Sequence, residues 1–201
     1  MKFINNVNET LRDDMAAEMQ KGSKLSIAAA YFSIYAFEAL RKELSNIDEL
    51  RFIFTDPTFI QKENSKKEKR EFYIPKLNRE RGIYGTEFEV KLRNELNQKA
   101  IARECAAWVK NKAIFKSNVG NKDITDKFIL LDDKAYFPVN AFTTVDLGCE
   151  QGNNMGTNIA KVASPMSLTL LEQFEKLWQN DEELKDVTNN VISSISSAYN
   201  E

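Results

Sequence analysis

The chain has 201 residues and a formal net charge of −2, with 42% hydrophobic and 29% charged residues. This balance is typical of one soluble globular domain with a substantial core, and it argues against a uniformly basic nucleic-acid binder, although it allows a local basic patch. The sequence contains no histidine, which excludes a Ser-His-Asp triad, a Cys-His pair and a histidine metal site within this chain.

Cysteine usage and hydrophobic patterning predict a cytoplasmic protein. Cys105 and Cys149 lie far apart and form no CxxC pattern, so we interpret them as reduced thiols and expect neither a metal nor another cofactor. No apolar run approaches the roughly 18 residues of a membrane span, and the N-terminus lacks the apolar region of a signal peptide. We therefore expect neither export nor membrane insertion.

The first segments alternate between helical and strand patterns. A helix is predicted over 8–21 with Asn8 as N-cap. A strand over 24–32, apolar on both faces, precedes a helix over 34–44 and a second strand over 50–54. Strand, helix and strand make a β-α-β unit, which implies a parallel strand pair and a right-handed crossover.

Ser33 lies where the predicted strand 24–32 turns into the helix 34–44. The carboxyl end of a strand beside a helix N-terminus favours anions. Two interpretations stay open, an anion-binding position and a plain helix cap.

Residues 61–82 are strongly basic. They carry eight lysines and arginines against four glutamates, a local excess of four positive charges, with Phe72, Tyr73 and Tyr84 in or near the segment. Basic residues mixed with aromatic ones suit a nucleic-acid backbone with base stacking, whereas a solvated insertion explains the same composition without a ligand. The candidate nucleic-acid patch consists of Lys66, Lys67, Lys69 and Arg70.

A long helix is predicted over 86–111, with a capping-box pattern at its start, and a strand begins at Ala113. Residues 148–156 are predicted to form a glycine-rich loop. It is not a P-loop, because no Gly-Lys-Ser/Thr follows. Ser167 is expected to cap a further helix, and a last helix is predicted from Asp181 onward. We therefore divide the chain into an α/β domain over 1–180 and a helical extension or linker over 181–201, leading to a following domain.

The segment Thr125–Asp132 combines a short buried strand with polar residues at both ends. Phe128 to Leu131 form the apolar run, and Asp132-Asp133-Lys134 predicts a hairpin to a strand over 135–139. Lys127 at the base of a buried strand needs an anion, which is either a carboxylate or a ligand phosphate, or else it reaches solvent.

The spacing Thr125-x-Lys127-x4-Asp132 resembles the H-x-K-x4-D motif of the phospholipase D superfamily, with threonine in place of histidine. Downstream, 137–148 stands where that family has a G-S-x-N-[LF]-T loop. Phe142, Thr143 and Leu147 match, whereas Pro138-Val139 replaces Gly-Ser and Ala141 replaces the asparagine. Upstream, residues 30–40 resemble a strand-to-helix turn of a subgroup found at the N-terminus of bacterial helicase-like proteins.

The resemblance implies a mixed α/β sheet flanked by helices, with Thr125, Lys127 and Asp132 at the motif positions. It also implies a phosphate site in which the ammonium of Lys127 is joined by neutral donors of Thr125, Ser33, Asn140 and Thr143. Family chemistry uses a histidine nucleophile, which this chain lacks, so no catalytic residue is assigned. Glu150 lies near an acidic position of the family, where it either pairs with Lys127 or is exposed.

Three functions follow as alternatives. The first is a non-catalytic accessory domain of a helicase or DNA translocase, which binds DNA or other nucleic acid or mediates assembly, with covalently linked helicase domains and a homodimer as expected partners. The second is an active phosphodiesterase or nuclease, which needs Thr125 as nucleophile or a histidine from another chain. The third is a dimerisation scaffold in which Lys127 and Asp132 form an internal ion pair or face solvent.

Overall fold

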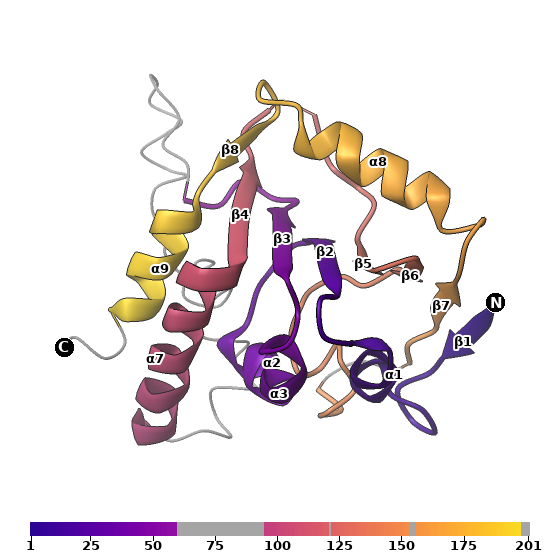
Figure 1. Cartoon of the computed structure of the whole chain (residues 1–201), viewed down its shortest axis with the longest axis horizontal. Helices are drawn as coiled ribbons and strands as arrows, with labels where there is room; N and C mark the ends of the chain where they lie inside the picture. The colour runs from indigo at the N-terminus through magenta and orange to yellow at the C-terminus, as the bar shows by residue number, and fades with distance from the viewer. Residues whose placement is uncertain (60–94, 121, 153–155, 198–201) are drawn as a thin grey trace.

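The computed structural model describes residues 1–59, 95–120, 122–152 and 156–197. In this part of the chain, eight strands form one sheet in the order β1-β7-β6-β5-β2-β3-β4-β8 (Figure 1). The strands are Lys2–Ile4 (β1), Lys24–Ala29 (β2), Glu49–Phe54 (β3), Ala113–Asn118 (β4), Phe128–Leu131 (β5), Lys134–Phe137 (β6), Ile159–Val162 (β7) and Leu184–Asp186 (β8). The helices are Leu11–Glu18 (α1), Ile34–Ala39 (α2), Arg41–Leu44 (α3), Glu95–Lys112 (α7), Leu168–Trp178 (α8) and Thr188–Ser196 (α9).

The sheet is mixed, as predicted. Strands β2, β3 and β4 run parallel, while all the other pairs are antiparallel. The parallel β2–β3 pair confirms the predicted β-α-β unit, and the β5–β6 pair confirms the hairpin at Asp132-Asp133. Asp132 turns the chain with a φ of 52°, a left-handed conformation that aspartate tolerates better than most residues.

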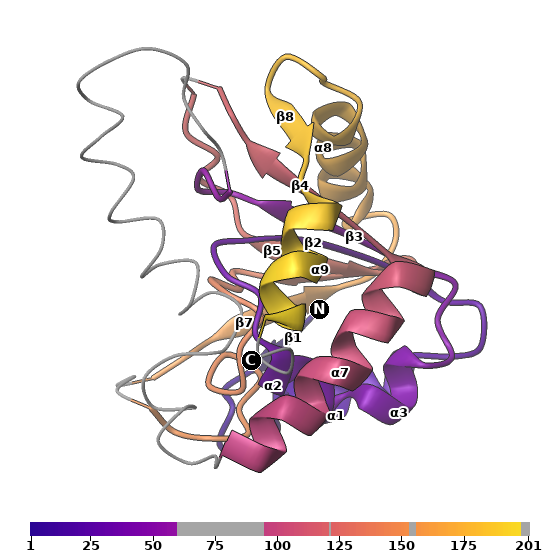
Figure 2. The same cartoon turned by 90° about the vertical axis from the view of Figure 1, so that its left-hand side faces the viewer.

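Helices cover the two faces of the sheet unequally. On one face, α1, α2, α7 and α9 enclose the larger core, which includes Leu11, Phe37 and Val191. On the other face, α8 packs through Phe174 on Ala28, Ile53 and other sheet residues, and it is the one helix there among the described residues. Figure 2 shows α8 on the opposite side of the sheet from α1, α2 and α7. Strands β2 and β5 are buried on both faces, as expected for central strands.

Cationic side chains of the sheet hold helix α8 in place. The guanidinium of Arg51 lies 5.0 Å from the ring centroid of Phe174 and forms an ion pair of 2.5 Å with Glu175. The amine of Lys116 lies 4.3 Å from the Trp178 ring and donates to the Trp178 carbonyl at 2.9 Å. Cation–π contacts on a partly buried face therefore fix α8 over β3 and β4.

Several predicted boundaries need correction. Helix α1 begins at Leu11 rather than 8, because Thr10 is the N-cap and its side chain accepts a hydrogen bond from the Asp13 amide. The strand predicted over 24–32 ends at Ala29. The helix predicted over 34–44 is two helices, because Leu40 has a non-helical backbone with φ −119° and ψ 17°.

The C-terminal part also differs from its prediction. The helix expected from Asp181 is replaced at residues 184–186 by β8, which pairs with β4, and the helix itself is α9. Ser167 precedes α8, but its hydroxyl donates to the Asp133 carbonyl at 2.6 Å instead of capping the helix. The predicted start of the long helix at 86 lies outside the described residues, and α7 confirms its remainder.

Two glycines offer a matched test of local packing. Gly148 and Gly22 have φ of 82° and 87°, so alanine at either one adopts a left-handed backbone that costs about 1–2 kcal/mol. At Gly148, however, a Cβ would lie 2.6 Å from Oδ1 of Asn6, whereas at Gly22 its nearest neighbour is 3.8 Å away. The Asn6 side chain cannot move without loss, since it donates to the Asp146 carbonyl and accepts from the Leu11 amide.

We therefore expect Gly148→Ala to lower the free energy of unfolding by about 1–3 kcal/mol more than Gly22→Ala does. Urea unfolding monitored by circular dichroism measures both variants. Equal losses of stability in the two variants would show that the close contact between residue 148 and the Asn6 side chain does not affect the free energy of unfolding.

Candidate phosphate-binding site

A pocket of about 460 Å³ lies where the parallel strands β3 and β4 end and the chain approaches β5. Thr55, Asp56 and Pro57 follow β3, Asn118 ends β4, and Lys127 directly precedes β5. Because β5 runs antiparallel to β2, its first residues lie at the same edge of the sheet as the carboxyl ends of the parallel strands. Crevices at this edge are common ligand sites in α/β proteins. The lining residues are Thr55, Asp56, Pro57, Asn118, Gly120, Lys122, Asp123, Ile124, Thr125 and Lys127.

Buried polar residues of β4 hold the turn after β3. The Asn118 amide donates to the Thr55 carbonyl at 3.1 Å and to the Lys122 carbonyl at 3.0 Å. The Ser117 hydroxyl accepts from the Thr58 amide at 2.8 Å. Asn118 and Ser117 are 3% and 0% exposed, so these bonds are shielded from water and fix the backbone that carries Asp56.

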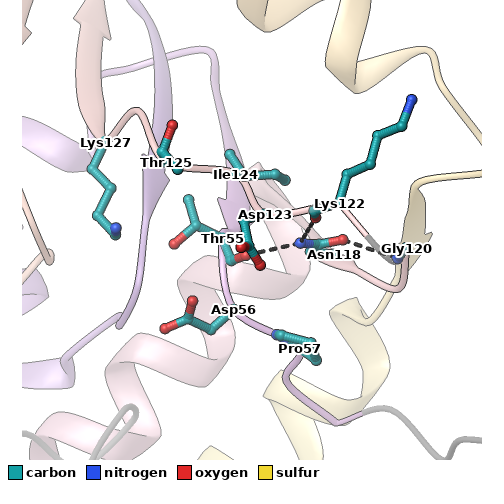
Figure 3. A pocket seen from close by; sticks show the side chains of 10 residues that line it. All are labelled: Thr55, Asp56, Pro57, Asn118, Gly120, Lys122, Asp123, Ile124, Thr125 and Lys127. Atoms are coloured by element: carbon teal, nitrogen blue, oxygen red, sulfur yellow. Dashed lines mark hydrogen bonds between the residues drawn. The ribbon is translucent and has the colours of Figure 1, made fainter.

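The pocket contains charges of both signs. Lys122 and Lys127 supply two cations, and Asp56 and Asp123 supply two carboxylates. In Figure 3 the Lys127 amine, the Thr55 hydroxyl and the Asp56 carboxylate face one space, whereas the Lys122 side chain extends away from it. Within the described part of the chain, none of the four charged side chains forms a hydrogen bond or an ion pair.

Of the predicted site residues that the structure describes, only Thr125 and Lys127 line this pocket. Ser33 is fully buried, and its side chain accepts from the Tyr35 amide at 3.1 Å as the cap of α2. The Thr143 hydroxyl donates to Asp146 at 2.6 Å, and Asn140, whose side chain is exposed, uses its carbonyl to accept from the Ala30 amide. The expected grouping of Lys127 with Ser33, Asn140 and Thr143 therefore does not form one pocket, because two of these hydroxyls serve local turns.

Asp132 lies at the opposite end of β5 from Lys127. Its carboxylate accepts from the Ser23 hydroxyl at 2.8 Å and from the Lys24 amide at 3.0 Å. Four strand residues separate it from Lys127, a span of roughly 16 Å at about 3.3 Å per residue. The internal Lys127–Asp132 ion pair expected of a scaffold is thus absent, and Asp132 instead ties the hairpin to the start of β2.

Apolar side chains occupy the loop positions where the family pattern has serine and asparagine. Val139 and Ala141 are each 3% exposed, and Val139 belongs to the larger core. Neither can donate a hydrogen bond to a ligand.

Glu150 does not line the pocket that contains Lys127. It accepts from the Thr144 hydroxyl at 2.8 Å and borders a second cavity of about 470 Å³ beside Asn5 and Asn6.

Thr55, Asp56 and Asn118 also line the pocket, although no motif in the sequence indicated them as site residues. Thr55 and Asp56 directly follow the predicted strand over 50–54, and polar residues after a parallel strand are themselves a signal for a ligand site. The predicted patch of Lys66, Lys67, Lys69 and Arg70 lies outside the described residues. In the described part of the chain, no cluster of acidic or cysteine side chains is suited to hold a metal, and no helix is long and apolar enough to span a bilayer.

Comparison with known proteins identifies the fold of this chain. No protein-family model matches the sequence, and no curated protein matches it significantly. Among solved structures, phosphatidylserine synthase of Haemophilus influenzae Rd KW20, a phospholipase D superfamily member, aligns with a TM-score of 0.52 and 13% identity over 97% of this chain. The chain has a phospholipase D-like fold. The chain spans 43% of that neighbour's length. At this low identity, the likeness supports the fold and says nothing about activity.

Proposed function

We propose that this chain is a non-catalytic phospholipase D-like domain that binds nucleic-acid phosphate in the strand-end pocket. The observation that supports this most is Lys127, whose amine faces the pocket and forms no hydrogen bond or ion pair within the described part of the chain. An ammonium at the end of a buried strand gains most from an anionic oxygen, and a phosphate supplies several.

The absence of histidine supports binding without cleavage. Thr125 is exposed, and in Figure 3 its hydroxyl points away from the space that the Lys127 amine faces. A threonine hydroxyl also needs an adjacent base before it attacks a phosphorus atom. If the pure protein hydrolysed a generic phosphodiester and Thr125→Ala abolished this activity, the result would contradict the proposal and show that the chain is an active phosphodiesterase.

The basic segment 61–82 adds to the proposal through its position in the chain. It begins four residues after Pro57, which lines the pocket. The segment carries an excess of four positive charges, and Coulomb attraction to a polyanion extends over about 8–10 Å at physiological salt.

Fluorescence anisotropy with labelled single-stranded oligonucleotides, measured between 50 and 200 mM salt, tests the proposal directly. We expect the logarithm of the association constant to fall linearly with the logarithm of the salt concentration. Lys127→Ala should weaken binding about tenfold and lower the salt slope by about one. Changing Lys66, Lys67, Lys69 and Arg70 together to glutamine should lower the slope further.

Lys110→Ala is the matched control. Lys110 is an exposed lysine near the C-terminal end of α7 and does not line the pocket, so its loss should leave affinity and slope unchanged. Three results would contradict the proposal: no binding, binding that does not depend on salt, or equal affinity of the Lys127 and Lys110 variants.

We further propose, from the sequence resemblance, that the domain serves a helicase or DNA translocase as a covalently linked accessory domain, with a homodimer as a second form of assembly. The coding sequence of the gene tests the first part, and we expect it to join this domain to an ATP-dependent motor. Sedimentation of the pure protein tests the second.

A further inference from the structure

The strand-end pocket is poorly suited to a phosphate that carries no other polar group. Asp56 and Asp123 line the same pocket as Lys122 and Lys127, so the charges of its four ionic residues balance. A bare phosphodiester meets like-charge repulsion from carboxylates, whereas a ligand with hydroxyl groups next to its phosphate can donate hydrogen bonds to them. The balance of charges therefore selects for a phosphate with a hydroxylated neighbour.

Thr55 provides a second, independent observation. Its side chain is 1% exposed, and its Oγ1 atom is buried without a hydrogen-bond partner in the described part of the chain. Buried hydroxyls are usually satisfied, so an orphaned one at the wall of a cavity indicates a ligand contact. In Figure 3 this hydroxyl is directed into the space between the Lys127 amine and the Asp56 carboxylate.

We infer that the pocket recognises a ribose phosphate, and hence RNA in preference to DNA. The inference rests on the proposed binding of nucleic-acid phosphate. The Lys127 amine contacts a phosphate oxygen, the Asp56 carboxylate accepts a hydrogen bond from the neighbouring 2′-hydroxyl, and the Thr55 hydroxyl forms a further hydrogen bond to the same ligand. The 2′-hydroxyl is both a donor and an acceptor, and it is the group by which proteins distinguish RNA from DNA.

The test compares three oligonucleotides of one length and base: oligo(U), oligo(dU) and 2′-O-methyl oligo(U). They share phosphate charge and base, so they differ only in the group at the 2′ position. We expect the wild-type protein to bind oligo(U) about tenfold more tightly than the other two, as a hydrogen bond to a carboxylate predicts. Methylation removes the donated proton but keeps the oxygen, so it separates donation to Asp56 from simple contact.

Asp56→Ala should tighten binding to oligo(dU) by removing repulsion and should reduce the preference for oligo(U) to near unity. Asp123→Ala is the charge-matched control, because it removes a carboxylate from the same pocket. It should raise the affinity for all three ligands and keep the preference. Loss of the preference in both variants would overturn the assignment of Asp56.

Thr55→Val gives a second readout that does not depend on charge. Because it removes an orphaned buried hydroxyl, we expect the melting temperature of the free protein to be unchanged or higher while affinity for oligo(U) falls about fivefold. Circular dichroism establishes folding for every variant. A valine variant that binds as tightly as wild type would remove Thr55 from the site.

The outcomes separate this inference from the proposed function. Binding that depends on Lys127 but is equal for oligo(U) and oligo(dU) would overturn the ribose preference and leave phosphate binding intact. Binding that does not depend on Lys127 would overturn both.

Discussion

Replacing Phe115 by alanine is expected to lower the free energy of unfolding by about 3–5 kcal/mol. Phe115 lies on β4, is fully buried and contacts three other rings. Its centroid lies 5.0 Å from that of Phe32, 5.3 Å from that of Phe52 and 5.7 Å from that of Phe54. Truncation removes the transfer free energy of the ring, leaves a cavity that its rigid neighbours cannot fill, and loses edge-to-face and stacked contacts.

Two companion variants make this result interpretable. Phe115→Leu keeps most of the volume and should cost well under half as much as the alanine variant. Phe3→Ala removes a ring that is 64% exposed on edge strand β1, so it should change the free energy of unfolding by less than about 0.5 kcal/mol. Urea unfolding at pH 7 measures all three. Similar losses at Phe3 and Phe115 would contradict the burial on which the prediction depends.

The central sheet was predictable because its signals are local. Lys24–Ala29 and Glu49–Phe54 are apolar runs bounded by turns, and the Asp132-Asp133 pair marks a hairpin between two such runs. The edge strands were not predictable. Lys2–Ile4 and Leu184–Asp186 are three residues long, too short for a period to show, and they are strands only because β7 and β4 offer them unpaired backbone groups.

The candidate site was predictable only in part for a similar reason. Motif spacing identified Thr125 and Lys127, which are neighbours along the chain. Thr55 and Asn118 are far apart in sequence and meet because β3 pairs with β4 in parallel, an arrangement that no local pattern specifies. Ser33 and Thr143 were expected to face a ligand, but short polar side chains next to turns commonly satisfy nearby backbone or side-chain groups instead.

A buried carboxylate on α1 leads to a second large stability effect. Asp14 has a side chain that is 5% exposed, and its Oδ1 atom lies 2.7 Å from the Lys2 amine. Its Oδ2 atom lies 2.8 Å from the Lys161 amine and accepts from the Tyr136 hydroxyl at 2.6 Å. Asp14 thus joins α1 to β1, β6 and β7, and both amines lose a partner if it is removed.

We expect Asp14→Asn to lower the free energy of unfolding by about 2–4 kcal/mol at pH 7. Removal of one partner from a buried ion pair costs about 3–5 kcal/mol because the remaining charge is uncompensated. The cost here is smaller because Lys161 keeps Glu18 at 2.8 Å and Lys2 is 41% exposed. Asp13→Asn is the control, since the Asp13 side chain is 70% exposed and pairs with Arg12 at the surface, where such pairs contribute less than about 1 kcal/mol.

The pH dependence of the same variant provides a signature that a packing defect lacks. Burial alone would raise the pKa of Asp14, but hydrogen bonds from Lys161, Lys2 and Tyr136 outweigh it, so the pKa lies below its ordinary value of 3.8. A depressed pKa contributes stability that is present above pH 3.8 and is lost as the pH falls through the lower folded-state value. The difference between wild type and Asp14→Asn should therefore be constant from pH 7 to about pH 5 and shrink below pH 4. A difference that stays constant down to pH 2 would show that the carboxylate's charge does not stabilise the fold.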